Sequence, residues 1–176
     1  MFKAFCLTAA LFAVFAVTPE LTAQQSKTGP PAPVPPQILA ARKVFVSNAG
    51  GASFGTVFTE IVFDGGPDRI YNQFYAAMKG WGRYEIVASP ADADLVLKVS
   101  WLLTDTGLKL PVLGKLEVEV IDPKTTITLW SFDEYVRGAV LLSNRDKNFD
   151  RAMNTIVDRM KKLVELPTSA AASPAQ

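Results

Sequence analysis

Apolar and polar residues alternate in three runs in the second half of the chain. The runs span 94–103, 115–121 and 126–135, and an Asp-Pro-Lys-Thr sequence at 122–125 separates the last two. Alternation with a period of two predicts strands with one buried face, and a short polar segment with proline is typical of a turn. We therefore expect a long antiparallel ribbon here. The side chains predicted to face the core are Leu95, Leu97, Val99, Trp101, Leu116, Val118 and Val120.

Shorter strands are predicted earlier in the chain. The segments 42–47 and 83–87 are rich in β-branched and aromatic residues, which favour strands. The segment 56–63 has a similar content, and we expect it to form one arm of a hairpin at the edge of the sheet.

Two amphipathic helices are also predicted. The first begins near Pro67 and runs to about Lys79, and the second begins at Ser143 or Asn144. Apolar residues recur at steps of three and four along both helices, so each has one buried side. These residues are Ile70, Phe74, Ala77 and Met78 in the first helix, and Phe149, Met153, Ile156, Met160 and Leu163 in the second.

The order of these elements predicts the fold class. One strand, one helix, four strands and a final helix follow each other along the chain. Full burial of a large apolar side chain is worth roughly 1.5–3 kcal/mol, so both helices are expected to lie on the sheet. We expect an α+β two-layer sandwich, with a mostly antiparallel sheet of about four to six strands and two helices on one face.

The two ends of the chain differ in composition from the middle. Residues 1–23 contain Lys3, an uncharged apolar run and a short polar end, as a secretory signal peptide does. The apolar run has about 14 residues, whereas a membrane span needs about 20, so we expect no transmembrane span after removal of the leader. This predicts a periplasmic or secreted protein, with a retained leader acting as an anchor as the alternative.

The rest of the chain divides into three parts. Residues 24–41 are rich in proline and are expected to be an extended linker, and residues 167–176 form a low-complexity tail that is expected to be disordered. Residues 42–166 are long enough to bury one core, so a single α+β domain is predicted there.

Composition excludes several kinds of chemistry. The chain has no histidine, and its one cysteine, Cys6, lies in the predicted leader. Catalytic triads built on histidine and the common zinc sites are therefore excluded, and we expect neither a cofactor nor enzymatic activity. The net charge is +1 and there are no long basic runs, so nucleic acid is not an expected partner.

The segments 84–97, 114–125 and 129–130, followed by a closing helix, resemble bacterial exported proteins and lipoproteins of uncharacterised families. The general shape is similar to the amino-terminal domain of TolB and to the CsgG and LpoB envelope proteins. The resemblance covers residues 42–166 and implies an envelope module that binds partners, with no catalytic residues to carry over. Two features depart from it: Thr126 stands where glycine is usual, which predicts a wider turn or a bulge, and a lipobox is absent.

Five residues are candidates for partner binding. In the alternation, Trp130 points to the other face of the strand from Ile127 and Leu129. It is therefore either exposed or covered by a helix. Glu117 and Glu119 share the outward face of one strand, where they could clamp a cation or meet a basic partner. The alternative is that this face is simply solvated, or paired with Lys or Arg of the neighbouring strand. Leu108 and Leu110 belong to an apolar loop at 104–113, which would form a docking patch if it is exposed.

Three functional hypotheses remain at this stage. The first is an exported, non-enzymatic cell-envelope module that binds a protein or a wall polymer through loops and a sheet edge. The second is a small-ligand carrier or a carboxylate-dependent hydrolase, which requires a pocket where at least two acidic residues converge. Its candidate residues are Asp64, Asp68, Asp92 and Asp94. The third is an assembly element without a ligand. The sequence determines neither the partner nor the oligomeric state.

Overall fold

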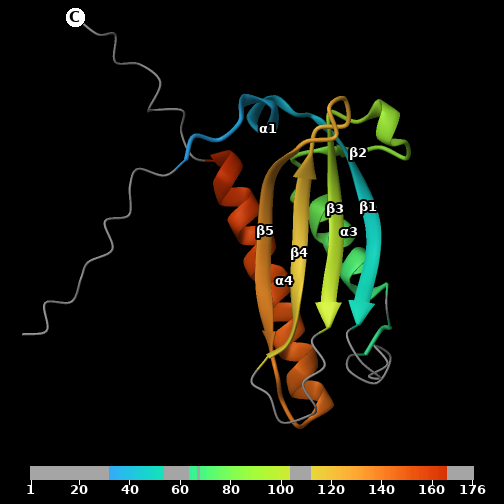
Figure 1. Cartoon of the computed structure of the whole chain (residues 1–176), viewed down its shortest axis with the longest axis vertical. Coiled ribbons are helices and arrows are strands. Elements are labelled where there is room, and N and C mark those ends of the chain that lie inside the picture. Colours follow the sequence, from blue (N-terminus) through green and yellow to red (C-terminus); the bar gives the residue numbers. More distant parts are fainter. Residues whose placement is uncertain (1–31, 54–63, 67, 104–111, 166–176) are drawn as a thin grey trace, which may run out of the picture. The chain divides into compact units, whose positions relative to one another are not determined.

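Five strands form one sheet in the computed structural model, which describes residues 32–53, 64–66, 68–103 and 112–165. The strands are β1 (Lys43–Ser53), β2 (Glu85–Ile86), β3 (Leu95–Leu103), β4 (Val112–Ile121) and β5 (Thr128–Arg137). Their order across the sheet is β2-β1-β3-β4-β5 (Figure 1). The chain divides into two units, 1–32 and 33–176, and every element described here belongs to the second.

The sheet is mixed. β1 is parallel to both β2 and β3, whereas β3, β4 and β5 form the antiparallel ribbon that the alternation predicted. Along this ribbon Leu97 lies opposite Val120, and Val99 lies opposite Val118. The predicted inward residues of β3 and β4 are all buried. The α+β sandwich is therefore confirmed, with two parallel and two antiparallel pairings.

Two long helices cover one face of this sheet (Figure 1). They are α3 (Arg69–Trp81) and α4 (Leu142–Glu165). The predicted stripe on α4 is buried throughout, and on α3 only Ala77 remains partly exposed. α4 begins one or two residues before the expected Ser143 or Asn144. α3 ends at Trp81 and is followed by Gly82, whose left-handed φ of 69° is typical of a helix end.

A short helix, α1 (Pro36–Ala40), precedes the sheet. Ile38 and Ala41, in and just after this helix, are buried in the core. The segment expected to be an extended linker up to residue 41 thus contributes two core side chains. A second short helix, η1 (Pro90–Asp92), connects β2 to β3, and Ser89 caps it by accepting a hydrogen bond from the Ala91 N–H.

The boundaries of several elements differ from the prediction. β1 continues six residues beyond Ser47 with a bulge between Asn48 and Gly51, and β2 is limited to two residues. The predicted bulge near the β4–β5 turn is confirmed: Thr126 has a φ of 59°, and the register shifts after Val120. The expected hairpin arm at 56–63 lies outside the described residues. No helix in the described part of the chain is long and apolar enough to cross a membrane.

Candidate binding surface

The predicted partner-binding glutamates lie on the face of the sheet opposite the helices. Glu119 accepts a hydrogen bond from Lys98 Nζ of β3 at 2.6 Å, and Glu117 lies 3.5 Å from Lys115 Nζ. Glu119 thus pairs with a cation of the neighbouring strand, as the alternative interpretation expected, whereas the cation beside Glu117 belongs to its own strand. Their role in partner binding stays a prediction.

Trp130 lies on the helix-covered face. It stands opposite the buried Val120 in the β4–β5 register, and its indole is half-buried against the core. The sequence left exposure and helix cover open for this residue, and the structure favours cover. Leu108 and Leu110 lie outside the described residues.

The four acidic residues of the hydrolase hypothesis do not gather at one place. Asp94 accepts hydrogen bonds from the N–H groups of Arg42 and Lys43, at the start of β1, whereas Asp68 bonds the side chain of Asn48. Lys43 and Asn48 are five residues apart, which is about 16 Å along a strand. Asp92 belongs to η1, on the Asp94 side, and Asp64 precedes α3, on the Asp68 side. Within the described residues, no three acidic or cysteine side chains group as a metal site would require.

Side chains of α4 occupy the free edge of β5. Among the described strands, β5 is the last in the sheet order and pairs only with β4. Arg159 Nη1 donates to the carbonyl oxygen of Asp133 at 2.9 Å, and Asn148 Nδ2 donates to that of Arg137 at 3.0 Å. These carbonyls cannot at the same time accept bonds from an added strand, which is one way in which proteins protect sheet edges.

The opposite edge of the sheet is open along most of β1. The pairing of β1 with the two-residue β2 ends at Val44 and Ile86. The Val87 N–H donates to the Val44 carbonyl at 2.9 Å, so the even-numbered residues of β1 direct their backbone groups to this edge. Val46 and Asn48 are the next such residues. In the described part of the chain, no strand pairs with them on that side.

A groove follows this open edge. Its lining residues come from β1, α3 and the end of β2: Phe45, Val46, Tyr71, Tyr75, Ile86, Val87 and Ala88. Phe45 and Val46 are consecutive and therefore point to opposite faces of the sheet, so the groove lies at the edge itself. The rings of Tyr71 and Tyr75, one helical turn apart, have their centroids 5.9 Å from each other. Unpaired backbone groups beside an aromatic wall are what an added strand needs.

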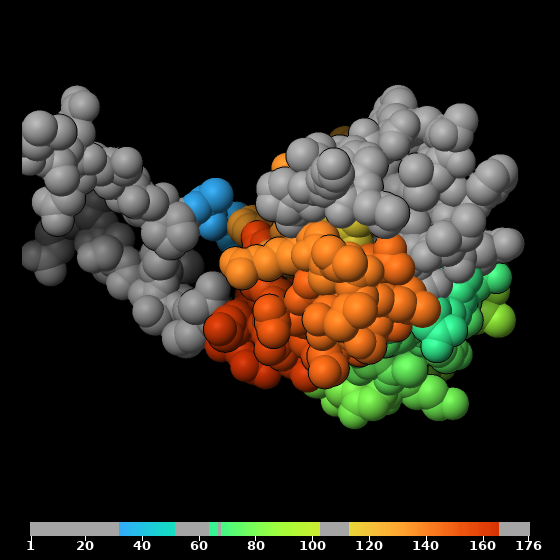
Figure 2. All heavy atoms as spheres, turned by 90° about the horizontal axis from the view of Figure 1, so that it is seen from below, coloured from blue at the N-terminus to red at the C-terminus, as the bar shows by residue number. Residues whose placement is uncertain are grey.

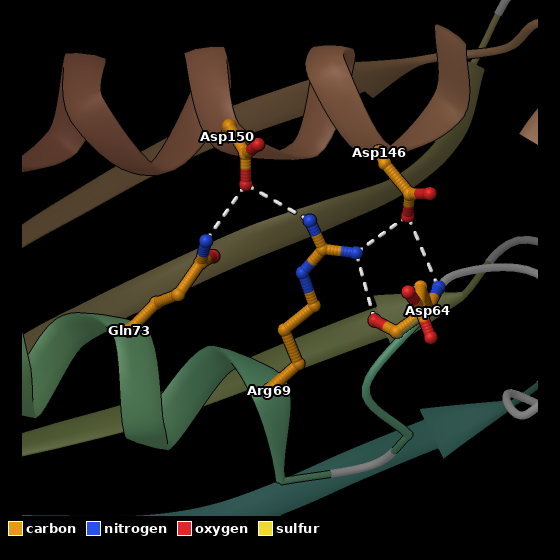
Figure 3. Close-up of polar contacts among 5 residues, drawn as sticks. All are labelled: Asp64, Arg69, Gln73, Asp146 and Asp150. Carbon is orange, nitrogen blue, oxygen red and sulfur yellow. Dashed lines mark hydrogen bonds and ion pairs between the residues drawn. The ribbon is translucent and has the colours of Figure 1, made fainter. Parts of the chain in front are cut away.

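A polar network holds α3 against α4 (Figure 3). The guanidinium of Arg69 contacts Asp146 at 2.5 Å and Asp150 at 2.9 Å, and Gln73 Nε2 donates to Asp150 at 2.7 Å. Arg69 also donates to the carbonyl of Asp64, whose N–H donates to Asp146. Most of the Arg69 side chain is shielded from solvent, which strengthens these contacts relative to those of an exposed pair.

This network sets the orientation of the two tyrosines. Tyr71 and Tyr75 each lie two residues after a residue of the network, Arg69 and Gln73. Because a helix turns about 100° per residue, the tyrosines lie about 200° away from the side that faces α4. α3 therefore contacts α4 with one side and presents the tyrosine pair to the β1 edge with another.

The electrostatics of Asp146 fit a structural role. Its burial acts to raise the pKa, but the hydrogen bond from the Asp64 N–H and the Arg69 guanidinium together outweigh burial and lower the pKa of this carboxyl. The carboxylate is therefore charged at neutral pH. It serves as an ion-pair partner rather than as a proton donor.

The tyrosine groove was missed at the level of sequence. The helix was predicted by its apolar stripe, and Tyr71 and Tyr75 fall outside that stripe. The available signal was an aromatic pair at a spacing of four residues, which places both rings on one side of a helix. That spacing does not reveal which strand the rings face.

Comparison with known proteins gives a limited result. No family model matches the chain, and no curated protein sequence matches it. Similar solved structures include a Xanthomonas campestris protein of family DUF330, with 14% identity, a TM-score of 0.44 and coverage of 68% of this chain and 81% of that one. A putative neuraminyllactose-binding hemagglutinin homologue from Helicobacter pylori has 13% identity, a TM-score of 0.42 and coverage of 72% and 87%.

A third structure is PelC from Paraburkholderia phytofirmans, solved as a dodecamer, with 16% identity, a TM-score of 0.43 and coverage of 70% and 87%. Similarities at this level carry no argument about function. None of the three is TolB, CsgG or LpoB, so that part of the resemblance stays a prediction.

Proposed function

We propose that this chain is an exported, non-enzymatic module of the cell envelope that binds an extended segment of a partner protein along the β1 edge. The observation that carries the proposal is the length difference between β1, with 11 residues, and β2, with 2. It leaves the backbone groups of Val46 and Asn48 without a strand partner in the described part of the chain, beside a groove walled by two tyrosines.

A polypeptide suits this site better than a wall polymer. The N–H and C=O groups of an edge strand repeat at the spacing of another strand, so main-chain hydrogen bonds provide affinity and the groove selects side chains. The β5 edge offers fewer free backbone groups to an added strand, because Arg159 and Asn148 already donate hydrogen bonds to two of its carbonyls. The proposal thus places the sheet-edge contact at β1. Export rests on the leader-like residues 1–23.

The hydrolase and carrier hypothesis receives no comparable support. Asp92 and Asp94 lie near one end of β1, and Asp64 and Asp68 lie near the other. The pKa of Asp94 is lowered by the hydrogen bonds from the Lys43 and Arg42 N–H groups, which is the wrong direction for a general acid.

Site-specific photo-cross-linking tests the proposal. Benzoylphenylalanine replaces Tyr71 or Tyr75 in the full chain, expressed in the source organism, and Tyr135 serves as the control position. Tyr135 is 57% exposed and lies on the β5 edge that α4 occupies. Circular dichroism of each purified variant verifies the fold.

We expect one protein adduct from positions 71 and 75, with cross-links confined to one short segment of the partner, and none from position 135. Equal adducts at all three positions, or none at 71 and 75, would contradict the proposal. A carbohydrate adduct at 71 or 75 would make a wall polymer the partner. The mass of the mature amino terminus tests export separately: a start at Gln24 is expected, and a chain that retains Met1 in the cytoplasm would contradict it.

A further inference from the structure

Three consecutive exposed aliphatic residues lie where the connection from β5 enters α4. Val140 is 85% exposed, Leu141 62% and Leu142 45%. The other large hydrophobic residues with high exposure in the described part, Ile127 and Tyr135, are isolated in sequence. Single exposed apolar residues are ordinary, whereas a contiguous apolar group on a surface usually contacts something.

The local backbone fixes these side chains on the surface. The N–H groups of Asn144 and Arg145 both donate to the Leu141 carbonyl at 3.1 Å, which makes a tight turn at the start of α4. Figure 2 views the domain from the end where this connection and the first turns of α4 lie, both in orange. The aliphatic residues thus stand at an end of the domain, on a well-defined turn.

The charge around this turn is positive. Arg137, Lys147 and Arg151 are exposed, and no ion pair to another described residue involves them. The same stretch, residues 137–151, holds two carboxylates, Asp146 and Asp150, which share the guanidinium of Arg69, and its four cations outnumber them. Exposed cations beside exposed aliphatic side chains are the combination by which peripheral proteins bind anionic lipid surfaces.

We propose that the β5–α4 turn inserts Val140, Leu141 and Leu142 into the interface of an anionic lipid bilayer, with Arg137, Lys147 and Arg151 against the headgroups. A hydrated wall polymer would leave the aliphatic side chains without an apolar environment. A second copy joined by a twofold axis would bring the same cations together, which is unfavourable. The turn uses none of the residues of the β1 edge, so this inference is independent of the proposed function.

A fluorescent probe at the turn tests this inference. In the full chain, Cys6→Ser removes the native thiol, and Leu141→Cys carries an environment-sensitive NBD label. The matched control carries the label at Lys124→Cys, in the β4–β5 turn near α1 at the other end of the domain (Figure 1). The vesicles contain either phosphatidylcholine alone or an equimolar mixture with phosphatidylglycerol. Because the probe reports its own position, binding of the leader elsewhere does not produce the signal.

We expect a several-fold, blue-shifted rise in emission at position 141 with the phosphatidylglycerol vesicles, a much smaller rise with phosphatidylcholine, and none at position 124. About 1 M salt, where the Debye length is about 3 Å, should remove the preference for anionic vesicles. Reversing the charges in Arg137→Glu with Lys147→Glu should abolish the rise at 141. Three results would overturn the inference. The first two are equal emission changes at positions 141 and 124, and no change at 141. The third is emission at 141 that rises with protein concentration in the absence of vesicles.

Discussion

Arg159 of α4 donates a hydrogen bond of 2.9 Å to the backbone carbonyl of Asp133 on the free edge of β5. A helix that covers one face of the sheet thus reaches round its edge and occupies a group that an added strand would use. The β1 edge has no such protection in the described part of the chain beyond Val44. The two edges of this sheet therefore differ in their capacity to accept a strand.

Removal of the Arg159 side chain should expose the β5 edge. We expect Arg159→Ala to lower the free energy of unfolding by about 0.5–1.5 kcal/mol, as the loss of one hydrogen bond does, and to increase self-association. Urea unfolding and sedimentation velocity measure these two effects. Arg151→Ala is the matched control, since Arg151 is another exposed arginine of α4 and its side chain bonds no strand carbonyl of the described residues. Equal self-association of the two variants would show that Arg159 does not protect the edge.

Gly51 should not accept a side chain. A Cβ atom added there would overlap the Nε1 and Cδ1 atoms of Trp101, which is buried on the neighbouring strand. We expect Gly51→Ala to destabilise the domain by about 1–3 kcal/mol, because the indole must move within a packed core. Gly80→Ala is the control: Gly80 lies in α3 with open space around it, and alanine there should stabilise by about 0.5–1 kcal/mol. A neutral Gly51→Ala in urea unfolding would contradict the contact.

The sequence predicted the parts of the fold that depend on periodicity. β3, β4 and β5 have one core face and one open face, so their alternation determined both the strands and their inward residues. The parallel pairing of β1 was not predicted, because parallel and antiparallel strands share the same period. Ile38 was assigned to a linker for its proline-rich neighbours, yet its side chain is buried in the core.

The candidate site was much harder to predict. The groove exists because β2 stops at Ile86 while β1 continues, and this depends on where the two strands meet in space. The protection of β5 depends on Arg159, which belongs to a polar face of α4 that looks simply solvated in sequence. Glu119 was chosen for its outward position, and its hydrogen bond with Lys98 needed the register of β3 and β4.

Acid should destabilise this domain in a defined range of pH. The pKa values of Asp94, Asp122 and Asp146 are all lowered in the folded state: for Asp94 and Asp122 chiefly by backbone N–H groups, and for Asp146 by a bonded N–H and Arg69, which together outweigh burial. A lowered folded pKa means that the unfolded chain binds protons more readily. The contribution to stability is therefore full above the unfolded value of about 4 and is lost as the pH falls through the folded value.

Urea unfolding between about pH 6 and about pH 2, the range in which carboxyl groups titrate, should show this loss on the acid side. Asp146→Asn should lower stability at neutral pH and make the decline with acid less steep, because one of the three linked carboxyls is gone. Asp158→Asn, an exposed carboxyl of α4 outside the network, should leave the slope unchanged. Identical slopes for wild type and Asp146→Asn would refute the role of the Arg69 network in the acid response.

Amide hydrogen exchange of the purified protein tests the availability of the β1 edge most directly. The N–H groups of Val46 and Asn48 are predicted to exchange orders of magnitude faster than those of Leu97 and Val118, which lie in strands paired on both sides. Slow exchange at Val46 and Asn48 in the absence of any partner would show that the edge is already paired, and it would contradict the account.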